Sequence, residues 1–159
     1  MPFEKKSNHP ENIAFIKQLK TLKDSDIDDM VHGIAHEETS KTDCTTCGNC
    51  CKSLHPALSE NDMINIAKHL DLDVIAVTNK YSEYDVQKKM YYMKSSPCSF
   101  LKDNRCDIYT NRPLSCHDYP HLHQKHFKYR INQVMFNYNI CPIVYNTVER
   151  VKKAMLNFE

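Results

Sequence analysis

The chain has 159 residues, and its 21 Lys and Arg residues nearly balance its 20 Asp and Glu residues, which leaves a formal net charge of +1. This balance creates no strong electrostatic field, so net charge indicates neither a nucleic-acid-binding nor a membrane-surface protein. The chain has two glycines, with no G-x-G-x-x-G and no phosphate-binding loop, which disfavours a nucleotide-binding Rossmann enzyme, including a methyltransferase of that fold. Hydrophobic residues make up 41% and charged residues 26%, as in ordinary globular proteins, and no apolar run approaches the roughly 18 residues of a transmembrane helix.

Helical patterns dominate the expected secondary structure. In the first half of the chain we expect helices over residues 10–22, 24–38, 59–70 and 73–80. Pro10 suits the first position of the first helix, and Ser25 is placed to cap the second. Ser59 followed by Asp62 is a weaker version of the capping box, which predicts the start of the third helix.

The second half of the chain is less regular. We expect a strand over residues 88–94, turns over 95–126, a helix or a strand over 127–139, and a helix over 142–158. We expect a single domain over residues 1–159, made of N-terminal helices (1–40), a cysteine-cluster region (44–141) and the C-terminal helix (142–158). The predicted fold class is mainly α with a small β element, built around an irregular, cysteine-rich, metal-centred core.

Four of the eight cysteines stand within one short stretch, CTTCGNCC, which begins at Cys44. The two-residue gaps between Cys44, Cys47 and Cys50 let a tight turn direct thiolates toward one point, as in zinc sites and in the C-x-x-C-x-x-C run that holds an iron–sulfur cluster. Gly48 lies in the second gap, where a turn can need a positive φ angle. Because adjacent side chains usually diverge, Cys51 is expected to serve a neighbouring site or to be a buried or reactive thiol.

The other four cysteines are spread over the second half of the chain, at Cys98, Cys106, Cys116 and Cys141. Each stands beside a turn or helix-start signal, and Cys141 precedes Pro142 at an expected helix N-terminus, where the helix dipole favours a thiolate. Eight thiolates can fill two four-cysteine zinc sites, or one 4Fe-4S cluster with a second centre or with four cysteines to spare.

The redox compartment decides between metal binding and disulfides. The N-terminal sequence lacks the apolar core of a signal peptide, so we expect a cytoplasmic protein, in which disulfides seldom persist. A disulfide framework and a set of buried free thiols are the alternatives to metal binding, and the cysteine spacing favours metal.

Histidines are further candidate ligands for a mixed zinc site. The stretch CHDYPHLHQKH contains His117, His121, His123 and His126. Among them His117 is the first candidate, although most histidines in such a run are surface residues. His32 and His36 have the i, i+4 spacing of a chelating pair on a helix, but no third ligand is apparent, so a helix surface is favoured.

Two other functions receive little support. The stretch KKMYYMK interleaves basic and aromatic residues, as surfaces that bind single-stranded nucleic acid do, but it is equally an amphipathic strand. We therefore do not expect a nucleic-acid partner. A nucleophile at Cys51, or at Cys116 paired with His117, would need a base in the fold, which adjacency in sequence does not supply.

The ordered set of motifs resembles that of a known family. The stretches CTTCGNCC, PCSFL and CDIYTNRPLSC, with YP shortly after, are similar to the pattern of the YkgJ-type cysteine-cluster family: C-x-x-C-x-x-C-C, P-C-x-F-L, C-x-I-Y, R-P-x-x-C and Y-P. The match spans residues 44–120, with Cys141 and Pro142 as late members, and His117 stands where the family often has arginine. The resemblance implies a zinc- or iron-chelating domain. Some members resemble flagellin lysine methylases with an iron–sulfur cluster, but this short chain lacks their extra length, so methylation is not carried over.

We therefore expect a metal-binding protein with a redox, metal-handling or accessory role, holding zinc or a 4Fe-4S cluster. The expected ligands are Cys44, Cys47, Cys50, Cys51, Cys98, Cys106, Cys116 and Cys141, and the expected cofactor contacts are Arg112 and His117. An apolar wall around the centre is expected from Phe100, Leu101, Ile108 and Tyr109. The alternatives are a structural zinc-binding interaction module and a catalytic or accessory component of a methylase-like enzyme. We do not expect the chain to be an enzyme by itself.

Overall fold

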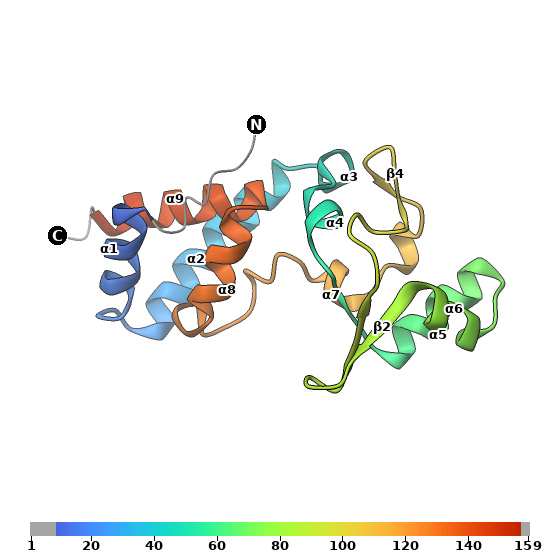
Figure 1. Cartoon of the computed structure of the whole chain (residues 1–159). Helices are drawn as coiled ribbons and strands as arrows, with labels where there is room; N and C mark the ends of the chain where they lie inside the picture. Colours follow the sequence, from blue (N-terminus) through green and yellow to red (C-terminus); the bar gives the residue numbers. More distant parts are fainter. Residues whose placement is uncertain (1–8, 157–159) are drawn as a thin grey trace. The chain divides into compact units, whose positions relative to one another are not determined.

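The computed structural model describes residues 9–156 and divides the chain into two compact units. Unit 1 comprises Met1–Asp43 and Pro120–Glu159, and unit 2 comprises Cys44–Tyr119. Helices dominate the described residues and the strands are short and antiparallel, so the predicted fold class, mainly α with a small β element, is confirmed (Figure 1). No helix among residues 9–156 has both the length and the apolar character that crossing a lipid bilayer requires.

Unit 1 is helical. Its elements are α1 (Pro10–Leu19), α2 (Asp24–Ser40), the 3-10 helix η3 (Phe127–Arg130), α8 (Ile131–Tyr138) and α9 (Pro142–Leu156). Helix α2 packs along α9, and α8 packs against α9 as well. The buried apolar side chains of this unit include Leu19, Ile27, Val31, Phe127, Val144 and Val148. Apolar residues at helical spacing therefore supply the core, as the sequence pattern predicts.

The helix predictions for unit 1 are confirmed, with corrections at their ends. Helix α1 stops at Leu19 because the amides that follow bond to carbonyls three residues back, which tightens the last turn. The predicted cap at Ser25 is wrong: Lys23 occupies the N-cap position, and the Ser25 hydroxyl donates to Asp26 inside the first turn. The segment 127–139, which the sequence leaves open between helix and strand, is helical. The last two residues of the predicted helix over 142–158 lie outside the described residues.

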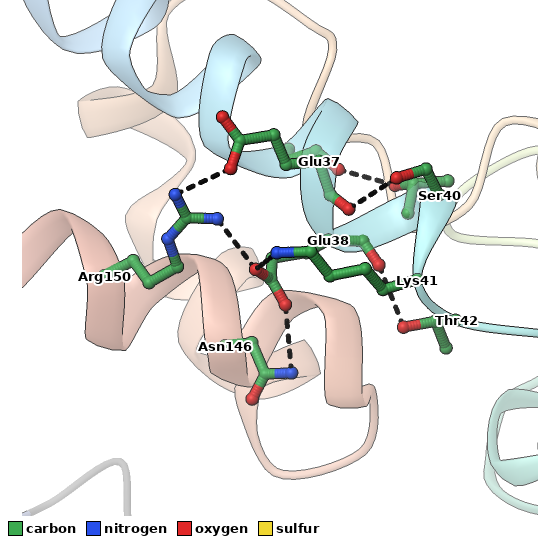
Figure 2. Close-up of polar contacts among 9 residues, drawn as sticks. Glu37, Glu38, Ser40, Lys41, Thr42, Asn146 and Arg150 are labelled. Atoms are coloured by element: carbon green, nitrogen blue, oxygen red, sulfur yellow. Dashed lines mark hydrogen bonds and ion pairs between the residues drawn. The ribbon is translucent and has the colours of Figure 1, made fainter.

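A polar cluster joins the last turn of α2 to α9 inside unit 1 (Figure 2). The carboxylate of Glu38, only 6% exposed as a residue, accepts hydrogen bonds from Arg150 (2.8 Å), Lys41 (3.2 Å) and Asn146 (3.2 Å). Arg150 also pairs with the exposed Glu37 at 2.7 Å. The hydrogen bond from Arg150, followed by that from Lys41, lowers the pKa of Glu38. A charged carboxylate with this many donors is stabilising when ionised.

We expect Glu38→Gln to lower the melting temperature at neutral pH more than the matched control Glu37→Gln, which removes the same charge at an exposed position one residue away. Because the folded-state pKa of Glu38 is lowered, its contribution is complete above the ordinary glutamate pKa and is lost as pH falls through the lowered value. The difference between wild type and Glu38→Gln should therefore close in acid. Thermal unfolding followed by circular dichroism at several pH values measures this, and equal effects of the two variants at neutral pH would contradict it.

Unit 2 combines short strands and helices. Its elements are α3 (Cys44–Cys47), α4 (Asn49–Ser53), β1 (Ala57–Leu58), α5 (Glu60–Leu70), α6 (Val74–Tyr81), β2 (Ser82–Asp85), β3 (Met90–Met93), β4 (Leu101–Lys102), β5 (Arg105–Cys106), the 3-10 helix η2 (Tyr109–Asn111) and α7 (Leu114–His117). The first three strands form an antiparallel sheet in the order β1-β3-β2, and β4 pairs with β5 separately. Helices α5 and α6 pack on each other (Figure 1). The core of the unit consists of Leu58, Met63, Ile66, Ala67, Val77, Met93, Phe100 and Ile108.

The local predictions for unit 2 are largely confirmed. The hydroxyl of Ser59 accepts from the amide of Asp62 and the carboxylate of Asp62 accepts from the amide of Ser59, which completes the predicted capping box of α5. The strand predicted over 88–94 is β3, the central strand of the sheet. Strand β2 was not predicted, because its sequence SEYD has too few apolar residues to alternate visibly.

Candidate metal centre

The cysteine-rich stretch folds into two short helices joined by a glycine. Helix α3 carries Cys44 and Cys47, helix α4 carries Cys50 and Cys51, and Gly48 lies between them with φ 63°. The prediction that Gly48 needs a positive φ angle is confirmed. This left-handed residue lets the chain reverse between the two helices, because other residues adopt the conformation only with strain.

A tight hairpin that the sequence analysis missed packs against this stretch. Strands β4 and β5 are joined by Asp103 and Asn104, with φ 48° and 63°, the two positive angles of a type I′ turn. Helix α3 lies against β5, and the carbonyl oxygen of Asn104 is 3.4 Å from the position that a Cβ on Gly48 would take. The Asp-Asn pair is a turn signal in the sequence, but the strands on either side of it are too short to show the alternation of apolar and polar residues that predicts a strand.

Backbone hydrogen bonds bring three of the cysteines into one local structure. The amide of Cys98 donates to the carbonyl of Cys51 at 2.8 Å, and the carbonyl of Cys98 accepts from the amide of Leu101 at 3.0 Å. Leu101 in turn pairs with Cys106 in the hairpin. Cys51, Cys98 and Cys106 therefore belong to connected segments, although up to 55 positions separate them in the sequence.

The thiols of Cys51, Cys98, Cys106 and Cys116 are each partly buried and interact electrostatically. Burial raises the pKa values of Cys98 and Cys106 and raises that of Cys116 to about 12, with further increases from the neighbouring thiols. The pKa of Cys51 is raised first by its contact with Cys50 and then by burial. If these sulfurs were ionised without a cation between them, they would repel one another.

The sulfurs of Cys50 and Cys51 lie 3.9 Å apart. In a tetrahedral zinc site with Zn–S distances of about 2.3 Å, neighbouring sulfurs are roughly 3.8 Å apart. The expectation that adjacent cysteines diverge is therefore not met at this pair. Among residues 9–156, no three Cys, His, Asp or Glu side chains already form a metal-ligand arrangement, so metal binding would require the thiols to close on a shared point.

Comparison with known protein families also indicates metal chelation. The model of the CxxCxxCC family, described as "Putative zinc- or iron-chelating domain", matches residues 43–142. The chain belongs to this family. Comparison with the curated proteins and with the solved structures gave no match.

In this CxxCxxCC domain, the charge of Arg112 acts on the thiol of Cys106. Its guanidinium stacks on the Tyr109 ring, 3.9 Å from the centroid, and donates to the Tyr109 carbonyl at 2.8 Å. The charge of Arg112 acts to lower the pKa of Cys106, against the larger effect of burial. Phe100 and Ile108 are buried as expected, whereas Tyr109 is 43% exposed and does not belong to an apolar wall. The role of Arg112 as a cofactor contact stays a prediction.

The candidate histidines fall in different places. His117 follows Cys116 on α7, and its Nδ1 lies 3.1 Å from Asp118, with two-thirds of its side chain exposed. His121, His123 and His126 belong to unit 1. There the buried carboxylate of Asp28 accepts hydrogen bonds from the amides of His126 (2.7 Å) and Phe127 (2.9 Å). These bonds anchor the backbone at His126 and Phe127 to α2.

Cys141 also belongs to unit 1, where it is buried. Its amide donates to the carbonyl of Asn137 at 2.8 Å, and its carbonyl accepts from the amide of Tyr145 at 2.9 Å at the start of α9. The position at a helix N-terminus is as predicted, and its role as a metal ligand stays a prediction.

Two glycine-to-alanine variants compare the left-handed Gly48 of the cysteine-rich stretch with a glycine inside helix α2. We expect them to change the free energy of unfolding in opposite directions. Gly48→Ala places a side chain at φ 63° against Asn104, and we expect it to lower the free energy of unfolding by about 1–2 kcal/mol. Gly33→Ala, in the middle of α2 with nothing within 4 Å of the new Cβ, should raise it by about 0.5–1 kcal/mol. Urea unfolding of both variants measures the difference. A Gly48→Ala protein as stable as wild type would show that the turn does not depend on glycine.

Proposed function

We propose that this CxxCxxCC protein binds a zinc ion or a 4Fe-4S cluster through the thiolates of Cys51, Cys98, Cys106 and Cys116. The observation that carries the proposal is the backbone pairing that joins the segments of Cys51, Cys98 and Cys106, together with the partial burial of these thiols and of Cys116. Four thiolates are the ligand set of a structural zinc site and of an iron–sulfur cluster. Cys44, Cys47 and Cys50, on the adjoining helices, are candidates for the same centre or for a second one.

The place of these sulfurs in unit 2 supports a stabilising role for the metal. Cys98 and Cys106 pack against the apolar core, beside the buried Phe100 and Ile108. A small unit with a limited core gains stability when a structural metal joins its segments, since the binding free energy is then part of the folding free energy. A cluster in the same position would add redox chemistry, whose potential the buried neighbours and the Arg112 charge would tune.

Metal content of anaerobically prepared full-length protein tests the proposal directly. Stoichiometric zinc without labile sulfide identifies a zinc site and favours the structural role. Iron with labile sulfide and visible charge-transfer absorption identifies a cluster and favours the redox or accessory role. Protein that contains neither metal, and that binds neither zinc nor a reconstituted cluster, would overturn the proposal.

Removing single sulfurs tests the ligand set. We expect Cys116→Ala and Cys98→Ala to lose most of the bound metal, because a three-thiolate site leaves one coordination position to water. Ser99→Ala is the matched control next to Cys98, since its hydroxyl bonds to the hydroxyl of Ser95, at 2.7 Å, on the exposed surface. Metal content and affinity of the purified variants give the answer, and retention of tight binding by both cysteine variants would exclude them as ligands.

Proton release gives an independent count of the ligands. The raised pKa values of Cys51, Cys98, Cys106 and Cys116 mean that these groups are neutral thiols near pH 7, so zinc binding must displace one proton from each. Zinc affinity should therefore rise with pH and fall in acid. Titration of the metal-free protein in weak buffer should release close to four protons per zinc, with fewer from Cys116→Ala. Release of one proton or none by the wild type would contradict the assignment.

A further inference from the structure

The carboxylate of Asp62 bonds to two separate elements of unit 2. One oxygen, Oδ2, accepts from the amide (2.8 Å) and the hydroxyl (2.7 Å) of Ser59, which caps α5. The other oxygen, Oδ1, accepts from the amide of Leu114 at 3.0 Å, the first amide of α7. A capping box needs only the first oxygen. The second oxygen links α5 to the turn that carries Cys116, and Asp62 is 8% exposed.

Helix α7 depends on such outside contacts. It has four residues, too few to be stable alone, and its first amides have no partner within the helix. Asp62 satisfies the amide of Leu114, and the hydroxyl of Ser115 donates to the carbonyl of Ala57 at 2.7 Å. These two bonds hold the two residues immediately before Cys116, and so they fix the turn that carries its thiol.

We propose that Asp62 is a positioning residue of the metal centre, which orients the Cys116 thiol through the backbone of α7. The inference rests on the proposed function, because it assigns Asp62 a role only if Cys116 binds metal. A hydrogen bond to an ionised acceptor is stronger than one between neutral groups, so an aspartate holds the turn better than a neutral side chain. Outer-shell residues that orient metal ligands change metal affinity about 10–100-fold when removed.

The test compares zinc affinity and the cobalt(II) spectrum of full-length variants. Thiolate-to-cobalt charge-transfer absorption grows with the number of bound thiolates, so it reports whether Cys116 remains a ligand. We expect Asp62→Ala to bind zinc about 10–100-fold more weakly and to lose charge-transfer intensity toward that of Cys116→Ala. Asp62→Asn, which keeps an acceptor for the amide of Leu114, should recover most of both. Asp62→Leu, which is larger than aspartate and also lacks an acceptor, replaces Asp62→Ala if the alanine protein does not fold.

Two matched controls separate positioning from helix capping. Asp73→Ala removes the cap of α6, a 2.7 Å bond to the amide of Ile75, and should leave zinc affinity and the cobalt spectrum unchanged. Ser59→Ala weakens the cap of α5 but keeps the bond from Asp62 to Leu114, so it should act like Asp73→Ala. Wild-type affinity and spectrum in Asp62→Ala, or an equal loss in Asp73→Ala, would overturn the inference. Failure of the wild type to bind any metal would instead overturn the proposed function.

Discussion

The burial of thiols on short segments is the constraint on which the arrangement of unit 2 depends. Cys51, Cys98, Cys106 and Cys116 interact while partly buried, so the metal-free unit keeps them as neutral thiols with raised pKa values. In the proposed site a divalent cation among them would reverse the balance, because the same burial that disfavours separate thiolates would strengthen their attraction to the metal. The segments that carry the sulfurs are short, and hydrogen bonds between segments hold them in place.

The two units are stabilised in different ways. Unit 1 buries apolar stripes of long helices. Arg150 donates to the buried carboxylate of Glu38 (Figure 2), and backbone amides donate to that of Asp28. Unit 2 has a smaller core, in which Cys98 and Cys106 extend the apolar cluster. In the first unit the carboxylates of Glu38 and Asp28 find their partners within the protein. In the second, the proposed metal would join the segments that carry the thiols, because its binding free energy would add to the folding free energy.

Local signals in the sequence predict the parts of the site that depend on neighbours along the chain. The left-handed Gly48, the capping box of Ser59 and Asp62, and the C-terminal helix from Pro142 follow from residue type and spacing alone. The family motif predicts metal chelation. The bond from Cys98 to Cys51 and the second role of Asp62 join residues about 50 positions apart, and no local pattern encodes such pairs. The cap predicted at Ser25 is wrong because α2 starts one residue before it, so residue type alone does not determine where a helix begins.

The adjacent pair Cys50 and Cys51 affects how the metal content of the proposed site is to be interpreted. Their sulfurs, 3.9 Å apart, are spaced like neighbouring ligands of one tetrahedral ion. Because Cys51 also raises the pKa values of Cys98, Cys106 and Cys116, the proposed site would have five sulfurs for the four positions that a single zinc ion offers. A mononuclear site leaves one of them as a free thiol beside the metal, whereas a centre with more than one metal uses it as a further ligand. The number of metal atoms bound per chain thus distinguishes these arrangements more directly than the loss of any single cysteine.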